Sequence, residues 1–124
     1  MRFLLDTHVL LWWLGDVEMA GQASAAIADP KNEIFVSAAS VWEIAIKRSL
    51  GKLDAPDDLV EEIELNGFSA LPITATHADL AGSLPRHHDD LFDRMLIAQA
   101  SQEQLLLMTR DEAFGAYEVQ RFLA

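Results

Sequence analysis

Short apolar runs alternate along the chain with longer segments of helical periodicity. Four runs predict buried strands, at residues 3–5, at 34–36, within 68–73 and at 105–108, because a strand covered on both faces shows no polar alternation. Helices are predicted between them over residues 8–14, 20–28, 40–50, 56–65, 74–82 and 91–103, with a strand-like segment near residue 119. This alternation indicates an α/β fold, a three-layer α/β/α sandwich with a central, mainly parallel sheet of four to five strands.

Individual polar residues and one proline mark where the predicted helices begin. Thr7 stands directly before the first helix and is expected to cap it, and Ser40 is expected to open the third. Pro56 fits the first turn of the fourth helix, where a missing N–H leaves no hydrogen bond unmade. Asp90 is expected to cap the sixth helix.

Length and composition favour one folded unit. With 124 residues, 51% of them hydrophobic, the chain is long enough for one core and too apolar for disorder, so a single domain over residues 1–124 is expected. Cysteine is absent, which excludes a disulfide framework, a thiolate metal site and a cysteine nucleophile. No apolar run resembles a signal peptide or a membrane span, so the expected location is the cytoplasm.

The charge balance restricts the possible partners. Twenty acidic residues against nine basic ones give a formal charge of −11. Such a surface repels nucleic acid, whose non-specific binding relies on Lys and Arg, but it attracts basic partners and divalent cations. Much of the excess lies between Asp54 and Glu64. These acids are expected to form the solvated face of a helix, and no chemistry is assigned to them.

Four acidic residues stand where a parallel sheet places its chemistry. Asp6 directly follows the first strand, and Asp111 follows the fourth strand after two intervening residues. Glu43 and Asp93 lie in the predicted first turns of the helices after strand two and before strand four. If strands one, two and four are neighbours, all four carboxylates meet at one edge of the sheet. Because crowded carboxylates repel unless a cation screens them, the sequence predicts a Mg²⁺ or Mn²⁺ site, which would suit hydrolysis of a phosphodiester.

Each of these acids also has a purely structural interpretation. Asp6 suits a loop or helix-cap position, and Ser40 with Glu43 has the spacing of a capping box. Asp93 and Asp111 suit the first turn of a helix, where the helix dipole stabilises negative charge. Taken one at a time, either interpretation fits. The coincidence of four acids at one sheet edge favours the metal site.

Histidine and basic residues near the predicted site have less specific signals. His87 and His88 precede two acids, but adjacent loop residues seldom point to one ion, so loop structure or phosphate contact is expected instead of metal binding. Lys47, Arg86 and Arg94 are predicted contacts for substrate phosphate. Surface ion pairing is the simpler alternative for these three.

Four blocks of sequence occur in an order that is specific to one family. They are residues 5–12 (LDTHVLLW), residues 40–44 (SVWEI) with Lys47 and residues 51–53 (GKL), residues 88–100 (with DLFDRMLIAQA), and residues 109–111 (TRD). Together they resemble the PIN domain and, more narrowly, the VapC-type toxins of type II toxin–antitoxin pairs. The blocks span nearly the whole chain, so the resemblance is far more specific than an isolated Asp-Thr pair.

The resemblance implies a Mg²⁺- or Mn²⁺-dependent endoribonuclease that hydrolyses RNA by metal-activated water. It also implies a homodimer and a cognate antitoxin that holds the enzyme inactive. Thr7 would be a supporting hydroxyl and Asp90 a supporting acid or loop cap, while Leu91 replaces the proline usual in the family and removes no ligand. The family's catalytic and metal-binding acids carry over onto four positions: Asp6, Glu43, Asp93 and Asp111.

Two other functional classes fit parts of the pattern. A receiver-like Mg-binding signalling domain has a similar size and an acidic pocket, but it needs an acidic pair after strand one and a phosphorylated Asp after strand three. Here Asp6 stands alone, and Ile73 and Thr74 follow the third strand. The second alternative is a PIN fold that serves only as a protein-binding module. The presence of all four acids argues against it.

Overall fold

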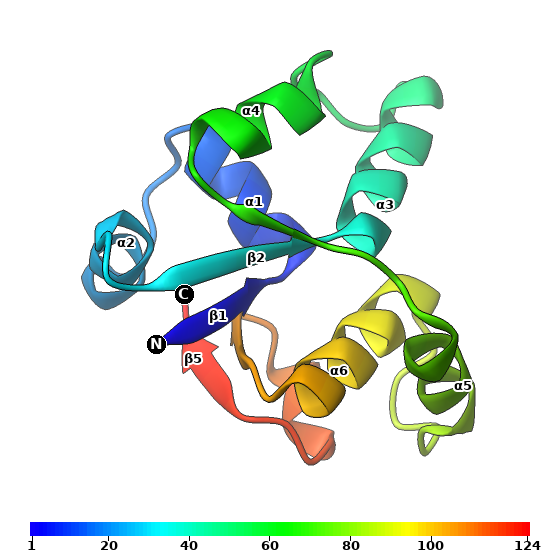
Figure 1. Cartoon of the computed structure of the whole chain (residues 1–124). Coiled ribbons are helices and arrows are strands. Elements are labelled where there is room, and N and C mark those ends of the chain that lie inside the picture. Colours follow the sequence, from blue (N-terminus) through cyan, green and yellow to red (C-terminus); the bar gives the residue numbers. More distant parts are fainter.

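The computed structural model describes all 124 residues and contains one five-stranded sheet (Figure 1). Its strand order is β3-β2-β1-β4-β5, and every neighbouring pair is parallel. The last strand begins two residues beyond the segment predicted near Val119. The strands are β1 (Arg2–Leu5), β2 (Glu33–Ser37), β3 (Ser69–Leu71), β4 (Leu106–Thr109) and β5 (Arg121–Leu123).

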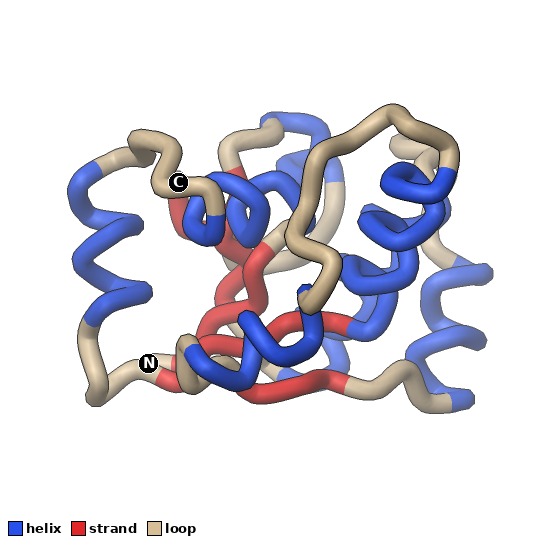
Figure 2. The backbone as a smooth tube through the Cα atoms, turned by 90° about the horizontal axis from the view of Figure 1, so that it is seen from above, coloured by secondary structure: helices blue, strands red, loops and turns tan.

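Helices cover both faces of this sheet (Figure 2). None of them combines the length and apolarity needed to cross a lipid bilayer. Because helices lie on both faces of a parallel sheet, the predicted three-layer α/β/α sandwich is confirmed. The helices are α1 (Thr7–Leu14), α2 (Gly21–Ala28), α3 (Ala38–Ser49), α4 (Leu59–Leu65), α5 (Ala75–Ser83), α6 (Leu91–Glu103) and the short 3-10 helix η1 (Glu112–Ala116).

Alternation along β1 divides the core into two apolar clusters. Phe3 and Leu5 point to one face of the sheet and Leu4 to the other, because successive side chains of a strand alternate. The first cluster joins β1 to helices on one face through Val9, Ile27, Ile44 and Ile63. The second joins it to α6 and η1 through Leu96, Ile97 and Phe114. Since β1 is buried on both faces, its sequence reads as a continuous apolar run.

The strand order decides between two of the predicted classes. In a receiver-like sheet the order is 2-1-3-4-5, so the third strand lies beside the first. Here β3 lies at the far edge, beyond β2, and β1 lies between β2 and β4. The receiver-like interpretation is therefore wrong. From β1 the sheet extends through β2 to β3 on one side, while β4 and β5 lie on the other side. Open α/β sheets form a crevice at the carboxyl ends of their strands where the strand order reverses in this way.

Helices α1 and α3 are capped by other residues than the sequence pattern suggested. Asp6 rather than Thr7 caps α1, accepting the Val9 N–H on Oδ1 at 2.8 Å. Ser37 caps α3, accepting the Ala39 N–H at 3.0 Å. The helix can begin directly after β2 because the strand's last residue supplies the cap. Glu43 consequently lies in the second turn and not in the predicted first turn, and the alternative interpretation as a capping box with Ser40 does not apply.

The fourth helix begins later than predicted, whereas the sixth begins where it was predicted. The fourth helix begins at Leu59, so Pro56 lies outside it, and the carbonyl of Pro56 accepts a hydrogen bond from Arg48. The predicted cap of α6 is confirmed, because Asp90 Oδ1 accepts the Asp93 N–H at 3.0 Å. That cap fixes Asp93 in the first turn of α6, as predicted.

Candidate metal centre

Asp6 and Asp111 meet at the carboxyl ends of β1 and β4. The Asp6 side chain is buried, and its Oδ2 accepts a hydrogen bond from the hydroxyl of Thr109, the last residue of β4. The same hydroxyl accepts the Asp111 N–H at 3.0 Å. Thr109 therefore links the two acids, a role that sequence reasoning did not assign to it. The available signal was its position two residues before Asp111 at a predicted strand end.

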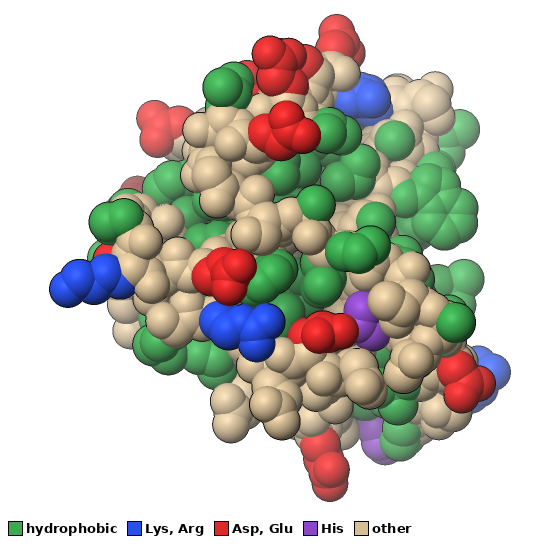
Figure 3. Space-filling view, in the orientation of Figure 1, with side chains coloured by type: hydrophobic (Ala, Val, Ile, Leu, Met, Phe, Trp, Pro, Cys, Tyr) green, Lys and Arg blue, Asp and Glu red, His purple; other side chains and the backbone are tan.

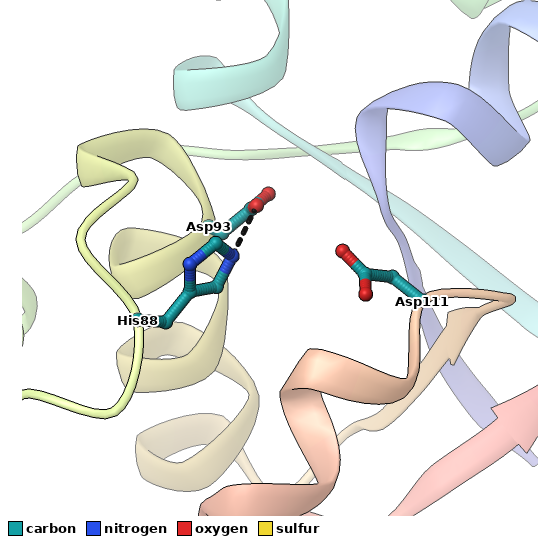
Figure 4. Close-up of side chains that lie close together, drawn as sticks. All are labelled: His88, Asp93 and Asp111. Atoms are coloured by element: carbon teal, nitrogen blue, oxygen red, sulfur yellow. Dashed lines mark hydrogen bonds and ion pairs between the residues drawn. The ribbon is translucent and has the colours of Figure 1, made fainter.

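Asp93 approaches this pair from α6, and His88 accompanies it (Figure 4). His88 Nε2 lies 2.8 Å from Asp93 Oδ2. His88, Asp93 and Asp111 each offer one ligand atom, and these three atoms lie within 4.8 Å of one another. The close-up shows the Asp111 carboxylate directed toward the other two side chains. The sequence pattern predicted a loop position for His88, with loop structure or phosphate contact instead of metal binding.

Glu43 supplies the fourth carboxylate from α3. Its side chain is only 6% exposed, and Oε2 accepts a hydrogen bond from Lys47 Nζ at 2.7 Å. Its Oε1 is buried without any hydrogen-bond partner, and it is the one such side-chain atom in the protein. Leaving a buried acceptor unpaired costs about 1–3 kcal/mol, and more for a charged group. A cation at this position would remove that cost, so the residues present fit a divalent metal ion.

Two of the four predicted acids, Asp6 and Asp93, have raised pKa values, and the charge of another acid contributes to each. The pKa of Asp93 is raised to about 6, chiefly by burial and then by the charge of Asp90, with a smaller contribution from Glu43, while the hydrogen bond with His88 lowers it. Burial also raises the pKa of Asp6, partly offset by the hydrogen bond from Thr109, and the charge of Asp111 adds to the increase. Asp6 thus repels Asp111, and Asp93 repels Glu43, while Asp93 and Asp111 lie in one group of possible metal ligands with His88. Repulsion of this kind is the condition that a bound cation relieves.

The remaining predicted residues lie around these acids with different roles. Thr7 is buried, and its hydroxyl donates to Ser40 Oγ at 3.0 Å, so it ties α1 to α3 instead of contacting an acid. Asp90 is a helix cap beside Asp93. The hydrogen bond to Glu43 raises the pKa of Lys47, which keeps its charge beside that carboxylate. Arg86 is exposed at the surface.

Arg94 is not available to bind substrate phosphate, which corrects the sequence prediction. Arg94 is only 5% exposed. One helical position separates it from Asp93, so the two side chains leave α6 about 100° apart, and Arg94 points toward the end of α5. Its guanidinium donates to four backbone carbonyls, those of Ala81, Leu84, Pro85 and His88.

The fold and the acidic centre agree with a known family. The model of the PIN domain matches residues 3–119, so the chain belongs to the PIN domain family. Its curated relatives include Ribonuclease VapC22 of Mycobacterium tuberculosis (strain ATCC 25618 / H37Rv). The two are 26% identical over 125 residues, which cover 95% of this chain and 93% of that protein. The resemblance inferred from the sequence blocks is confirmed.

Solved structures of other proteins share the fold at low sequence identity. The VapBC2 structure from Rickettsia felis, bound to a promoter DNA fragment, has a TM-score of 0.75 and 14% identity, covering 99% of this chain and 98% of that chain. The FitAcB structure from Neisseria gonorrhoeae has a TM-score of 0.66 and 22% identity, covering 98% and 96%. At these identities the likeness concerns the fold alone.

Proposed function

We propose that this protein is a metal-dependent endoribonuclease and the toxin of a type II toxin–antitoxin pair. The observation that carries the proposal is the partnerless, buried Glu43 Oε1 of a carboxylate whose charge acts on Asp93, in a PIN domain. The relative named Ribonuclease VapC22, aligned over nearly the whole chain, supports RNA as the substrate. That substrate makes the cytoplasm the proposed place of action.

Each acid has a proposed role in this reaction. Asp6, Asp93 and Asp111 would hold Mg²⁺ or Mn²⁺, which, when bound, stabilises charge on the phosphodiester and lowers the pKa of water. Glu43 Oε1 would orient the attacking water and accept its proton, while Lys47 holds Oε2. Because water attacks and the 2′-hydroxyl takes no part, the expected products carry 5′-phosphate and 3′-hydroxyl ends.

The central test is Asp6→Asn. Asparagine is as good a helix cap as aspartate, so the cap of α1 is kept and the protein should unfold at nearly the same temperature. Cleavage of RNA in Mg²⁺ or Mn²⁺ should be lost, because a charged ligand is removed. The matched control is Asp79→Asn, an exposed acid on α5, which should cleave like the wild type. Full activity in Asp6→Asn would contradict the assignment.

Substrate contact is proposed to be local. With a net charge of −11, the surface as a whole repels RNA. Lys47, beside Glu43, and the exposed Arg86 remain as the proposed phosphate contacts. Neutralising either one, as in Lys47→Met or Arg86→Met, should raise KM for RNA, and unchanged KM in both variants would remove them from the substrate path.

The proposed antitoxin contact is an apolar groove between α3 and α4. The groove has a volume of about 860 Å³, and its lining includes Val41, Ala45, Val60, Ile63 and Phe68. Acidic side chains gather over α4 at the top of Figure 3, with apolar surface below them. This combination suits the apolar face of an amphipathic antitoxin helix that carries basic residues along its edge.

A single exposed position tests that surface. Val60 is 57% exposed and lines the groove, so Val60→Lys should weaken co-purification with the protein encoded by the neighbouring gene while leaving RNA cleavage unchanged. Val17→Lys is the control, because Val17 is similarly exposed and does not line the groove. Independent elution of the two wild-type proteins at micromolar concentration would contradict the partner itself.

The proposed homodimer contact lies around the exposed Trp42, Ile73 and Leu91. These three apolar residues border a hollow of about 330 Å³, and Trp42 also packs edge-to-face on Phe92. Exposed apolar patches of this kind mark association surfaces. Sedimentation velocity should show a dimer for the wild type and for Leu65→Glu, which alters an exposed residue on α4, but a monomer for Trp42→Glu. A monomeric wild type at micromolar concentration would overturn this contact.

A further inference from the structure

His88 is held in place more firmly than a loop residue needs to be. Its backbone N–H donates to the hydroxyl of Tyr117 at 2.8 Å, and its carbonyl accepts from Arg94 at 3.2 Å. Its ring packs edge-to-face on Phe114, with centroids 6.1 Å apart and planes at 84°. Tyr117, Arg94 and Phe114 are all buried. Two hydrogen bonds and an aromatic contact, all from the core, therefore fix both the backbone and the ring of His88.

The same core residues also hold the preceding turn. The Tyr117 hydroxyl donates to the carbonyl of Pro85 at 2.8 Å, and Arg94 donates to the same carbonyl at 3.1 Å. His87, the neighbouring histidine, has a different environment, because it is exposed and its ring makes a T-shaped contact with Tyr117, with centroids 5.3 Å apart. The loop thus directs one imidazole of the pair to the acids and leaves the other at the surface.

The fixed ring faces the position where two carboxylates converge. His88 Nε2 lies 2.8 Å from Asp93 Oδ2, and an Asp111 oxygen lies within 4.8 Å of both ligand atoms (Figure 4). Two atoms that bind one ion at about 2.1 Å lie no more than about 4.2 Å apart. Asp111 is exposed, so a small rotation of its side chain closes this difference.

We infer that His88 is a ligand of the metal centre, and that its imidazole makes the site select Mn²⁺ over Mg²⁺. The inference rests on the proposed metal centre and adds a nitrogen donor to its oxygen set. Mg²⁺ takes oxygen ligands almost exclusively. Mn²⁺ is a transition-metal ion, and such ions also accept nitrogen donors such as imidazole. An all-carboxylate site would not make this distinction by ligand type. The nitrogen donor does.

Metal titration of the full chain without RNA tests the inference. Mn²⁺ binding is followed by electron paramagnetic resonance, and Mg²⁺ binding by its competition with Mn²⁺. The wild type should bind Mn²⁺ more tightly than Mg²⁺. In His88→Asn the affinity for Mn²⁺ should fall about tenfold or more, because even replacing a residue that only supports a metal ligand costs about that much. The affinity for Mg²⁺ should change little. His87→Asn is the matched control and should behave like the wild type.

Two further measurements separate ligation from an indirect effect. Pulsed electron paramagnetic resonance on the Mn²⁺ complex should show coupling to an imidazole nitrogen in the wild type and in His87→Asn, and none in His88→Asn. Tyr117→Phe removes the hydroxyl that accepts the His88 N–H, so it should weaken Mn²⁺ binding by a smaller factor and keep the nitrogen signal.

Several outcomes would overturn the inference. Equal loss of Mn²⁺ and Mg²⁺ affinity in His88→Asn would show that His88 only positions Asp93. Unchanged Mn²⁺ binding together with lost RNA cleavage would show that it acts on the substrate. Absence of a nitrogen signal in the wild type would exclude ligation directly. A wild type that binds Mn²⁺ with this signal but cleaves no RNA would contradict the proposed function while supporting His88 as a ligand.

Discussion

Asp6 and Asp111 each use one carboxylate oxygen to cap a helix. Asp6 Oδ1 accepts from Val9, and Asp111 Oδ1 accepts from Ala113. Capping and metal binding seemed to be alternatives when each acid was considered alone. The structure combines the cap with membership of the acidic cluster, because a carboxylate has two oxygens. The cap holds the buried Asp6 side chain in a defined direction before any ion arrives, whereas the exposed Asp111 needs only a small rotation to reach the ion.

Glu43→Gln is expected to separate stability from activity. Glutamine has the same shape and can still accept from Lys47, but it removes a charge from the acidic cluster. RNA cleavage should fall by about 10²- to 10⁴-fold, the range expected on loss of a catalytic base. The metal-free variant should be at least as stable as the wild type in thermal unfolding. Retained cleavage would exclude Glu43 as the base, and Glu61→Gln, an exposed change on α4, is the control.

The stability of the metal-free protein should fall as pH rises from about 4 to 6. The pKa of Asp93 is raised from 3.8 to about 6 in the folded state, chiefly by burial. The folded protein therefore binds this proton more tightly than the unfolded chain does. The resulting stabilisation is complete below the unfolded pKa and is lost as pH passes the folded pKa.

Urea unfolding across this pH range measures the effect. The free energy of unfolding of the wild type should decrease by on the order of 1–2 kcal/mol, after allowance for partial solvent screening. Asp93→Asn should show a smaller decrease, since the main titrating group is gone. Added Mn²⁺ should stabilise the wild type most above pH 6, where Asp93 is charged. A wild type whose stability rises over this window would contradict the cause given for the pKa shift.

At the scale of elements, the first turn of α6 organises one half of the site. Asp90 caps the helix, Asp93 faces the acids, and Arg94 ties the helix to the end of α5 and to the loop that carries His88. Three neighbouring functions thus depend on one helical turn. Because successive helical residues point about 100° apart, adjacent positions can serve the metal centre and the core separately.

Leu91→Pro is expected to stabilise the protein. Leu91 is the first residue of α6, where proline's fixed φ suits the helix, and the preceding Asp90 has φ −67° and ψ 119°, the extended conformation that a residue before proline adopts. The side chain is 78% exposed within one protomer, so little packing inside the chain is lost, and Leu91→Ala loses the same proposed dimer contact. The free energy of unfolding should rise by about 0.4–1 kcal/mol through lower entropy of the unfolded chain.

Thermal and urea unfolding check this change, with Leu91→Ala as the control. Alanine removes the same exposed side chain without fixing the backbone, so it should give no comparable gain. RNA cleavage should be unchanged in both variants, since Leu91 contributes no ligand. A destabilised Leu91→Pro would show that the backbone before α6 must move away from the conformation seen here.

At the scale of the whole molecule, the net charge opposes the proposed substrate. A basic nuclease loses affinity for RNA as salt rises, because the salt screens an attraction. With a charge of −11 the long-range interaction is repulsive, so moderate KCl should increase the rate of association with RNA. We expect this rate to rise between about 0.01 and 0.15 M KCl, where the Debye length falls from about 30 to 8 Å.

Stopped-flow binding of a labelled RNA to Asp6→Asn, at fixed Mn²⁺ concentration, measures this dependence without cleavage. Replacing exposed acids on α4, as in the double variant Glu61→Gln and Glu64→Gln, should flatten it. A rate that falls steadily with salt would show that a local basic surface dominates the encounter.

Local patterns along the sequence determined the alternation of strands and helices and the acids at their ends. An apolar run, a helical period or a capping residue acts over a few neighbours, so β1, α6 and the Asp90 cap could be predicted from the printed chain. The ordered blocks also determined the family. The starts of α1 and α3 were misplaced because several adjacent hydroxyl or carboxylate residues could cap each helix, and only packing selects among them.

Only the tertiary structure decided how distant segments meet. Strand order is a long-range property, and it placed β1 between β2 and β4 and excluded a receiver-like sheet. The burial of Arg94 against backbone carbonyls and the unpaired Oε1 of Glu43 exist only in the folded chain. The position of His88 beside Asp93 depends on Phe114 and Tyr117, which lie far away from it in sequence. Residue types and spacing located the acids, whereas hydrogen-bond partners and burial, which exist only after folding, support the proposed metal centre over a set of helix caps.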